Sequence, residues 1–222
     1  MSDCSISSAD QINFHWRKRR GSAVVLFFCS RCGDPNCRTQ LVQLQRRIDE
    51  LRDHHIEPYA VSYDTPEEHC RFVDEFGISH HLLSTADSAT IKRFVILKTL
   101  VEPDHPIRTS SGRSFHGIPV PGIYIVDTAG IVREEYFNRS YTTRNSTGMV
   151  LNSALGAVLR PEAASEQSWQ SERIGFRAFL SDPTLRLEYA ITLYVRFELA
   201  DGFHIYSEPS ARWIHSDDRR SR

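Results

Sequence analysis

The stretch "SAVVLFFCS" (22–30) constrains the fold most strongly, because it is a continuous apolar run rich in Val and Phe. Such a run is typical of a central strand that is covered on both faces. The chain then changes period, and apolar residues recur at spacings of three and four: Leu41, Leu44, Ile48 and Leu51. This stripe predicts a long helix packed directly after a buried strand.

The start of that helix is marked by Asp34 followed by Pro35. An Asp side chain can cap free backbone N–H groups, and Pro fits the first helical position. Cys37 is therefore expected in the first turn of the helix.

The rest of the chain alternates between strand and helix signals. In order they are a strand at 56–64, a helix at 64–77, a short helix at 87–96, a polar loop at 100–122, a strand pair at 122–137 and a helix at 143–160. The last helix has four expected inward positions: Met149, Leu151, Leu155 and Val158. This succession predicts an α/β fold with a central sheet flanked by helices.

The composition divides the chain into four parts. We expect an N-terminal arm at 1–21, a main α/β domain at 22–160, a linker at 161–172, and a small β-rich C-terminal segment with a disordered tail at 173–222. Such a short annex has little core of its own, so it either docks on the main domain or belongs to a truncated β module.

Charge and cysteine content limit the classes of function. The formal net charge is −1, which predicts no attraction to nucleic acid, and no segment approaches the roughly 20 apolar residues of a membrane span. A cytoplasmic location is expected. In a reducing compartment, the five cysteines are better explained as catalytic, metal-bound or buried thiols than as a disulfide framework.

The segment "VVLFFCSRCGDPNC" resembles the active-site segment of the peroxiredoxin (AhpC/TSA) family, in the thioredoxin-like superfamily. On this register Cys37 stands at the peroxidatic cysteine, Asp34 at a Thr or Ser, and Ser30 at a Pro. "GIPVPGIYIVDTAGIVREEYF" is also similar, with Pro121 where thioredoxin folds carry a cis-Pro. The resemblance spans about 22–145 and implies a thioredoxin-like fold with a mixed sheet, to which the C-terminal β annex is added.

A peroxidatic cysteine has to be a thiolate, which a helix N-terminus and a nearby cation favour. Asp34 would act against it as a like charge. The family implies an Arg from the strand after the long loop, but "PVPGIYIV" contains none. Arg31 or Arg38 is therefore the expected substitute.

The resemblance implies reduction of hydroperoxides through Cys37, with electrons from a thioredoxin-like reductant. Cys70 would be the resolving cysteine by likeness to the bacterioferritin-comigratory type, and Cys32 is the alternative, because a short loop joins it to Cys37. Two other functions remain open: thiol-disulfide exchange with a disulfide substrate, and a degenerate binding module without activity. A homodimer is an allowed assembly.

A metal site is the competing interpretation of the clustered thiols. Cys29, Cys32 and Cys37 offer three soft ligands, and a histidine could complete a zinc tetrahedron. The sequence contains no second closely spaced pair of ligands, so we expect no metal and no cofactor.

Overall fold

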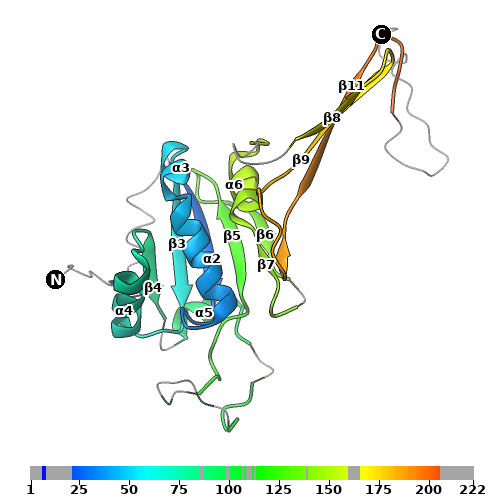
Figure 1. The fold of residues 1–222 in the computed structure, drawn as a ribbon. Coiled ribbons are helices and arrows are strands. Elements are labelled where there is room, and N and C mark those ends of the chain that lie inside the picture. Colours follow the sequence, from blue (N-terminus) through cyan, green and yellow to red (C-terminus); the bar gives the residue numbers. More distant parts are fainter. Residues whose placement is uncertain are drawn as a thin grey trace.

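The computed structural model describes residues 7–8, 22–85, 88–98, 101–106, 108, 112, 114–138, 140–159 and 166–205. Figure 1 shows an α/β body and a narrow β arm that projects from it. Apart from residues 7–8, the expected N-terminal arm lies outside the described residues, and so does the expected disordered tail. In the described part, none of the helices is long and apolar enough to cross a membrane.

The body is built on a six-stranded sheet with the order β1-β4-β3-β2-β5-β6. Its strands are β1 (Ser7–Ser8), β2 (Ala23–Cys29), β3 (Ile56–Ser62), β4 (His81–Ser84), β5 (Gly122–Val126) and β6 (Val132–Tyr136). β2 pairs parallel with β3 and antiparallel with β5, so the sheet is mixed, as predicted. The apolar run that was expected to form a central strand is β2.

Within the described residues, five helices accompany the sheet: α2 (Pro35–Arg46), α3 (Ile48–Asp53), α4 (Pro66–Phe76), α5 (Ala89–Arg93) and α6 (Thr147–Leu155). The stripe predicted for one long helix is buried throughout, but it is divided between α2 and α3 by a break at Arg47. α6 ends at Gly156 in the left-handed conformation. The expectation for Val158 is therefore wrong, because it lies beyond the helix and is 55% exposed.

Both faces of β2 are covered, as the continuous apolar run requires. Alternate residues Val25, Phe27 and Cys29 pack with α2, α3 and α6, whereas Val24, Leu26 and Phe28 pack with the α5 side. Because side chains alternate along a strand, Cys29 points to the same layer as α2. This layer contains the reactive region described below.

The chain after β6 forms two further sheets. Its strands are β7 (Arg144–Asn145), β8 (Gln167–Gln170), β9 (Ile174–Leu180), β10 (Tyr189–Ala190) and β11 (Leu193–Leu199). β11, β9 and β8 make the projecting arm, whereas β10 pairs with β7 in the body. The prediction of a linker at 161–172 is wrong for Gln167–Gln170, because these residues pair with β9. The annex thus docks through β10 and projects through the other three strands.

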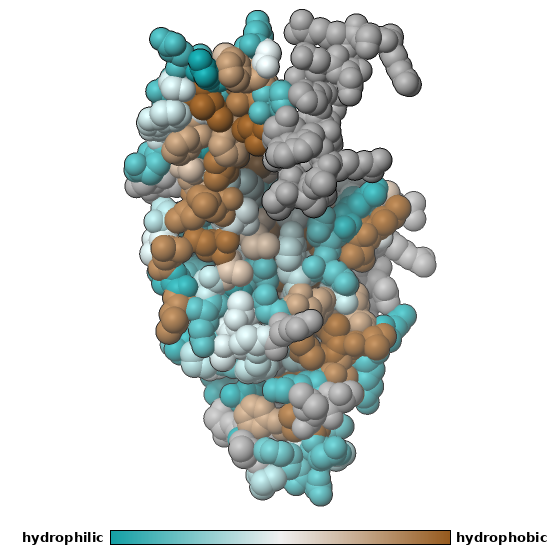
Figure 2. Space-filling model, turned by 90° about the vertical axis from the view of Figure 1, so that its right-hand side faces the viewer, coloured by the Kyte–Doolittle hydropathy of each residue, from teal (hydrophilic) through white to brown (hydrophobic). Residues whose placement is uncertain are grey.

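One face of the arm is apolar and uncovered. Cross-strand partners on it include Val195 with Ala178, Phe197 with Phe176 and Leu199 with Ile174. Val195 is 44% and Phe197 51% exposed. Figure 2 shows hydrophobic side chains gathered over the upper part of the molecule, where Figure 1 places the arm. Exposed apolar patches of this kind mark contact surfaces.

Candidate active site

Cys37 lies in the first turn of α2, where the sequence predicted it. The Asp34 carboxylate accepts hydrogen bonds from the backbone N–H groups of Asn36 and Cys37, each at 3.0 Å, and Pro35 occupies the first helical position. The helix thus begins as the Asp-Pro pair indicates. Its N-terminal dipole favours a negative charge on the thiol.

Three side chains surround the Cys37 sulfur, which has no exposed surface. Arg144 donates from Nη2 to Cys37 Sγ at 3.2 Å. Ser30 Oγ lies 3.5 Å from the same sulfur. The Cys29 side chain at the end of β2 also interacts with Cys37. A buried thiol with a guanidinium and a hydroxyl at its sulfur is arranged to hold a thiolate.

Arg144 comes from β7, directly before α6, and its side chain is only 3% exposed. Its Nη1 donates to the carbonyl of Tyr141 at 2.5 Å and to that of Thr143 at 3.1 Å. Nη2 is 3.8 Å from the Asp34 carboxylate. The guanidinium is therefore fixed by its own loop and faces both the thiol and the carboxylate that caps the helix.

These surroundings lower the pKa of Cys37 from near 9 to about 6. The largest cause is the hydrogen bond from the Cys29 side chain, followed by burial, which acts in the opposite direction, and then by the charge of Arg144. Asp34 raises the pKa, as expected, but Arg144 outweighs it. The pKa of Cys29 is raised well above its usual value, so this thiol stays protonated and can donate.

Tyr141 lies over the site. Its hydroxyl donates to the second oxygen of the Asp34 carboxylate at 3.3 Å, and Lys98 Nζ sits 4.0 Å from the ring centre. Burial raises the pKa of Tyr141 to about 12, so the hydroxyl remains a donor. Since Cys37 is fully covered, a substrate reaches its sulfur only when neighbouring groups move.

The model of the AhpC/TSA family matches residues 2–135. The chain belongs to the AhpC/TSA family. It is 24% identical over 133 residues to Peroxiredoxin Bcp of Escherichia coli K12, which covers 60% of this chain and 78% of that relative.

Two solved structures are similar to this chain. A serine mutant of Peroxiredoxin 6 from Arenicola marina superposes with a TM-score of 0.51 at 15% identity, covering 64% of this chain and 63% of that one. The bacterioferritin comigratory protein of Xanthomonas campestris gives a TM-score of 0.48 at 18% identity, with 63% and 80% covered. The first of these supports the thioredoxin-like fold expected from the sequence.

The cation at the thiol differs from both sequence-based candidates. Arg144 contacts Cys37, whereas Arg31 lies over the Phe115 ring and Arg38 is exposed on α2. The expectation of Arg31 or Arg38 is therefore wrong. No local motif marked Arg144, which lies beyond the range matched by the family model. Cys29 could have been found, because strand alternation turns it toward the layer that holds α2.

At two positions, Ser30 and Asp34, the chain carries a different residue from the family motif. Asp34, at the Thr or Ser position, caps the helix as predicted. The hydroxyl that this position lacks is supplied by Ser30, which stands at the Pro position and reaches the Cys37 sulfur. Pro121 precedes β5 and is buried, but among the described residues no peptide bond is cis. The expectation of a cis-Pro is wrong, since an extended X-Pro segment enters β5 with the favoured trans bond.

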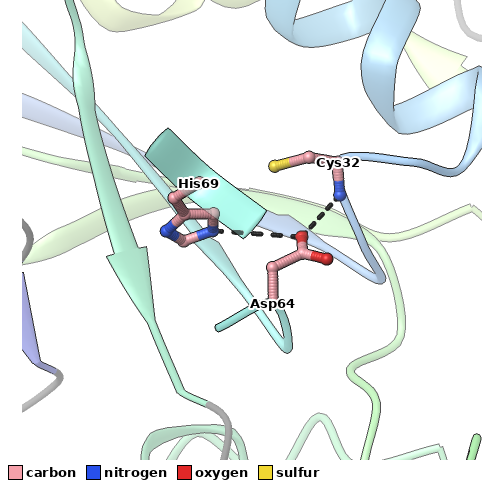
Figure 3. Close-up of side chains that lie close together, drawn as sticks. All are labelled: Cys32, Asp64 and His69. Carbon is pink, nitrogen blue, oxygen red and sulfur yellow. Dashed lines mark hydrogen bonds and ion pairs between the residues drawn. The ribbon is translucent and has the colours of Figure 1, made fainter. Parts of the chain in front are cut away.

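Cys32 belongs to a different cluster, with Asp64 and His69 (Figure 3). The backbone N–H of Cys32 and the hydroxyl of Ser62 donate to the same Asp64 oxygen, at 2.6 and 2.8 Å. His69 Nε2 lies 2.7 Å from the Ser62 oxygen. Burial, and then the Asp64 charge, raise the pKa of Cys32 well above its usual value. The network fixes the turn that leads into α2 and keeps the Cys32 thiol protonated.

This cluster does not fit a zinc ion. Two ligands about 2.1 Å from a tetrahedral zinc lie about 3.4 Å apart, whereas Asp64 Oδ2 and His69 Nε2 are separated by 3.9 Å. The Ser62 hydroxyl occupies the space between them and satisfies both. The alternative ligand set of Cys29, Cys32 and Cys37 does not converge on a histidine within the described part of the chain.

Cys70, the other candidate resolving thiol, lies on α4 and is half-buried. Cys29, Cys32, Cys37 and Cys70 are all free thiols in this structure. The geometry therefore brings Cys37 together with Asp34. Cys32 packs in the same buried cluster but is bonded through its backbone to Asp64, and Cys70 lies on α4.

Proposed function

We propose that the protein reduces hydroperoxides with Cys37 as the peroxidatic nucleophile. Family membership supports the activity. One observation identifies Cys37 as the nucleophile: its buried sulfur lies at a helix N-terminus and accepts a hydrogen bond from Arg144, and its pKa is lowered to about 6. At pH 7 a thiol with this pKa is about nine-tenths thiolate. A competent nucleophile is therefore present at neutral pH.

In the proposed reaction, the Cys37 thiolate attacks the terminal oxygen of the hydroperoxide. The O–O bond breaks, the sulfur becomes a sulfenic acid, and the alkoxide or hydroxide takes up a proton and leaves as alcohol or water. Arg144 and Ser30 would stabilise the thiolate and the developing charge on oxygen. Asp34 would hold the helix start, and Pro121 would shape the substrate side.

For the resolving step we propose Cys70 before Cys32. A resolving thiol attacks the sulfenic sulfur, forms a disulfide and releases water. The Cys32 thiol is buried and kept protonated beside Asp64, so it is a weak nucleophile. Cys70 is half-buried, so it is more accessible to a sulfenic acid than the buried Cys32. A thioredoxin-like reductant would then restore both thiols.

Two further parts of the proposal concern location and assembly. The free thiols support a reducing compartment such as the cytoplasm. The uncovered apolar face of the arm supports a homodimer, because two such faces can cover each other. Light scattering across a dilution series tests the assembly, and a monomer at all concentrations would contradict it.

The function is tested by single turnover. The reduced protein receives one equivalent of hydrogen peroxide or cumene hydroperoxide, and the products are examined by non-reducing peptide mass spectrometry. We expect consumption of the hydroperoxide in the wild type and in Cys32→Ser, none in Cys37→Ser, and a Cys37–Cys70 disulfide. A linkage to Cys29 or Cys32 would overturn the resolving assignment, whereas an unreacted hydroperoxide would overturn the function.

A further inference from the structure

Residues 181–192, called the strap below, leave the arm after β9, cross the body and return to the arm at β11. The strap is closed at its base, because the N–H of Ser181 donates to Thr192 O at 2.8 Å and that of Thr192 donates to Ser181 Oγ at 3.1 Å. Its middle contains β10, which pairs in parallel with β7. Figure 1 shows this segment beside the body while the rest of the annex projects away.

The strap forms backbone hydrogen bonds at both ends of β7, the strand of Arg144. The N–H of Arg144 donates to Glu188 O at 2.9 Å, and the N–H of Ser146 donates to Ala190 O at 2.9 Å. Glu188 has a φ of 63°, a left-handed conformation that non-glycine residues rarely adopt. Such conformations persist where surrounding contacts hold them, and here the held residue accepts the bond from Arg144.

Tyr189 of the strap also reaches the turn that carries the thiol. Its hydroxyl donates to the carbonyl of Asn36, the residue before Cys37, at 3.3 Å. On the opposite side, Gln40 of α2 donates to Asn145 O at 3.0 Å. β7 therefore lies between α2 and the strap, and a single strap residue is joined to the strand of Arg144 and to the turn of Cys37.

The strap packs closely against the start of α6 at Gly148. A Cβ atom at Gly148 would lie 2.0 Å from the carbonyl oxygen of Ser181. Asp182 forms an ion pair with Arg47 at the end of α2, at 3.5 Å. These contacts fix the strap on the body at points independent of β10.

We propose that the strap is a positioning element for the reactive thiol, and that Tyr189 and the carbonyls of Glu188 and Ala190 hold Arg144 against Cys37. This inference rests on the proposed function of Cys37 for its biological role. It assigns a purpose to the C-terminal segment, which lies beyond the range matched by the family model. The strap does not touch the sulfur and acts through Arg144.

The test compares two tyrosines of the annex in the full chain. Tyr189→Ala removes the strap contact with Asn36, whereas Tyr194→Ala removes the hydroxyl that accepts from Asn152 of α6 at 3.1 Å. The readout is the pH profile of iodoacetamide alkylation of Cys37, followed by peptide mass spectrometry. We expect Tyr189→Ala to raise the midpoint by about one unit, a tenfold change in the thiol equilibrium. Tyr194→Ala should leave it unchanged.

A double-mutant cycle decides whether the strap acts through Arg144. In an Arg144→Met background, Tyr189→Ala should produce no further shift, because the group that the strap positions is already absent. Equal, additive shifts in both backgrounds would overturn the proposal. It would also be overturned if Tyr189→Ala lowered the melting temperature as Tyr194→Ala does while the Cys37 profile stayed unchanged.

A measurement on the wild type covers the case in which a variant does not fold. Native-state hydrogen exchange should show the amides of Arg144 and Ser146 protected to a similar degree, since strap carbonyls accept from both. Exchange at the rate of an open loop would overturn the proposal. Neither the alkylation profile nor hydrogen exchange uses peroxide. A wild type that does not consume hydroperoxide would therefore overturn the proposed function but leave the test of the strap valid.

Discussion

Replacing Arg144 should have the largest effect on the thiol, and Arg144→Met removes the charge with little loss of volume. The guanidinium lies 3.2 Å from Cys37 Sγ. At that separation, effective dielectric constants between about 80 and 20 give about 1 to 5 kcal/mol of attraction. This corresponds to a rise of about one to four units in the pKa of Cys37. From about 6, the pKa would reach at least about 7, so half or less of the thiol would be ionised at pH 7.

The assay is the alkylation rate of Cys37 from about pH 4 to about pH 10, a range that spans the titration of a thiol, resolved by peptide mass spectrometry. Arg144→Lys should give an intermediate midpoint, because an ammonium keeps the charge but lacks the planar donors of Arg. Arg133→Met, which removes an exposed arginine paired with Asp127, should give the wild-type midpoint. The melting temperature of each variant, measured in parallel, reports that it is folded. A folded Arg144→Met with the wild-type midpoint would refute the electrostatic argument.

Three further predictions concern the surroundings of the same thiol. Cys29→Ala should raise the pKa of Cys37, because it removes the donor that is the largest cause of the lowered pKa. Cys29→Ser keeps a donor, so the pKa of Cys37 should stay close to the wild-type value. Equal pH profiles for the two variants would contradict this. Asp34→Asn should lower the pKa of Cys37 and leave the melting temperature nearly unchanged, because Asn caps helices about as well as Asp. Since the folded pKa of Cys37 is depressed, its stabilising contribution is present at high pH and is lost as pH falls through about 6. The test compares the unfolding free energies of the wild type and Cys37→Ser, measured with urea under reducing conditions. The difference should grow by about 2 kcal/mol from about pH 6 to about pH 8. A constant difference would show that the pKa of Cys37 is not lowered.

The sequence predicted the parts of the site that depend on local structure. The buried run of β2, the Asp34 cap and the position of Cys37 follow from periodicity and helix-capping rules. Arg144 could not be predicted in this way, because its placement depends on how β7 lies between α2 and the strap. The same holds for Ser30, whose hydroxyl reaches the sulfur only once β2 and α2 are packed together.

The errors have a similar origin. The polar composition of 161–172 indicated a linker, yet Gln167–Gln170 pair with β9. Strand formation at an exposed sheet is decided by the partner strand more than by composition. Cys32 looked like a free neighbour of Cys37, but Asp64, Ser62 and His69 from the next β-α unit determine its state.

The pairing of β7 with β10 also has a consequence for the order of events during synthesis. The N-terminal part of the chain, with Cys37 on α2, can emerge and pack before the carbonyls of Glu188 and Ala190 exist. Domains generally begin to fold from the N-terminus as they are made. If the strap positions Arg144, the pKa of the nascent Cys37 thiol stays higher until Glu188 and Ala190 have been translated, and a chain that stops before them reacts more slowly with peroxide.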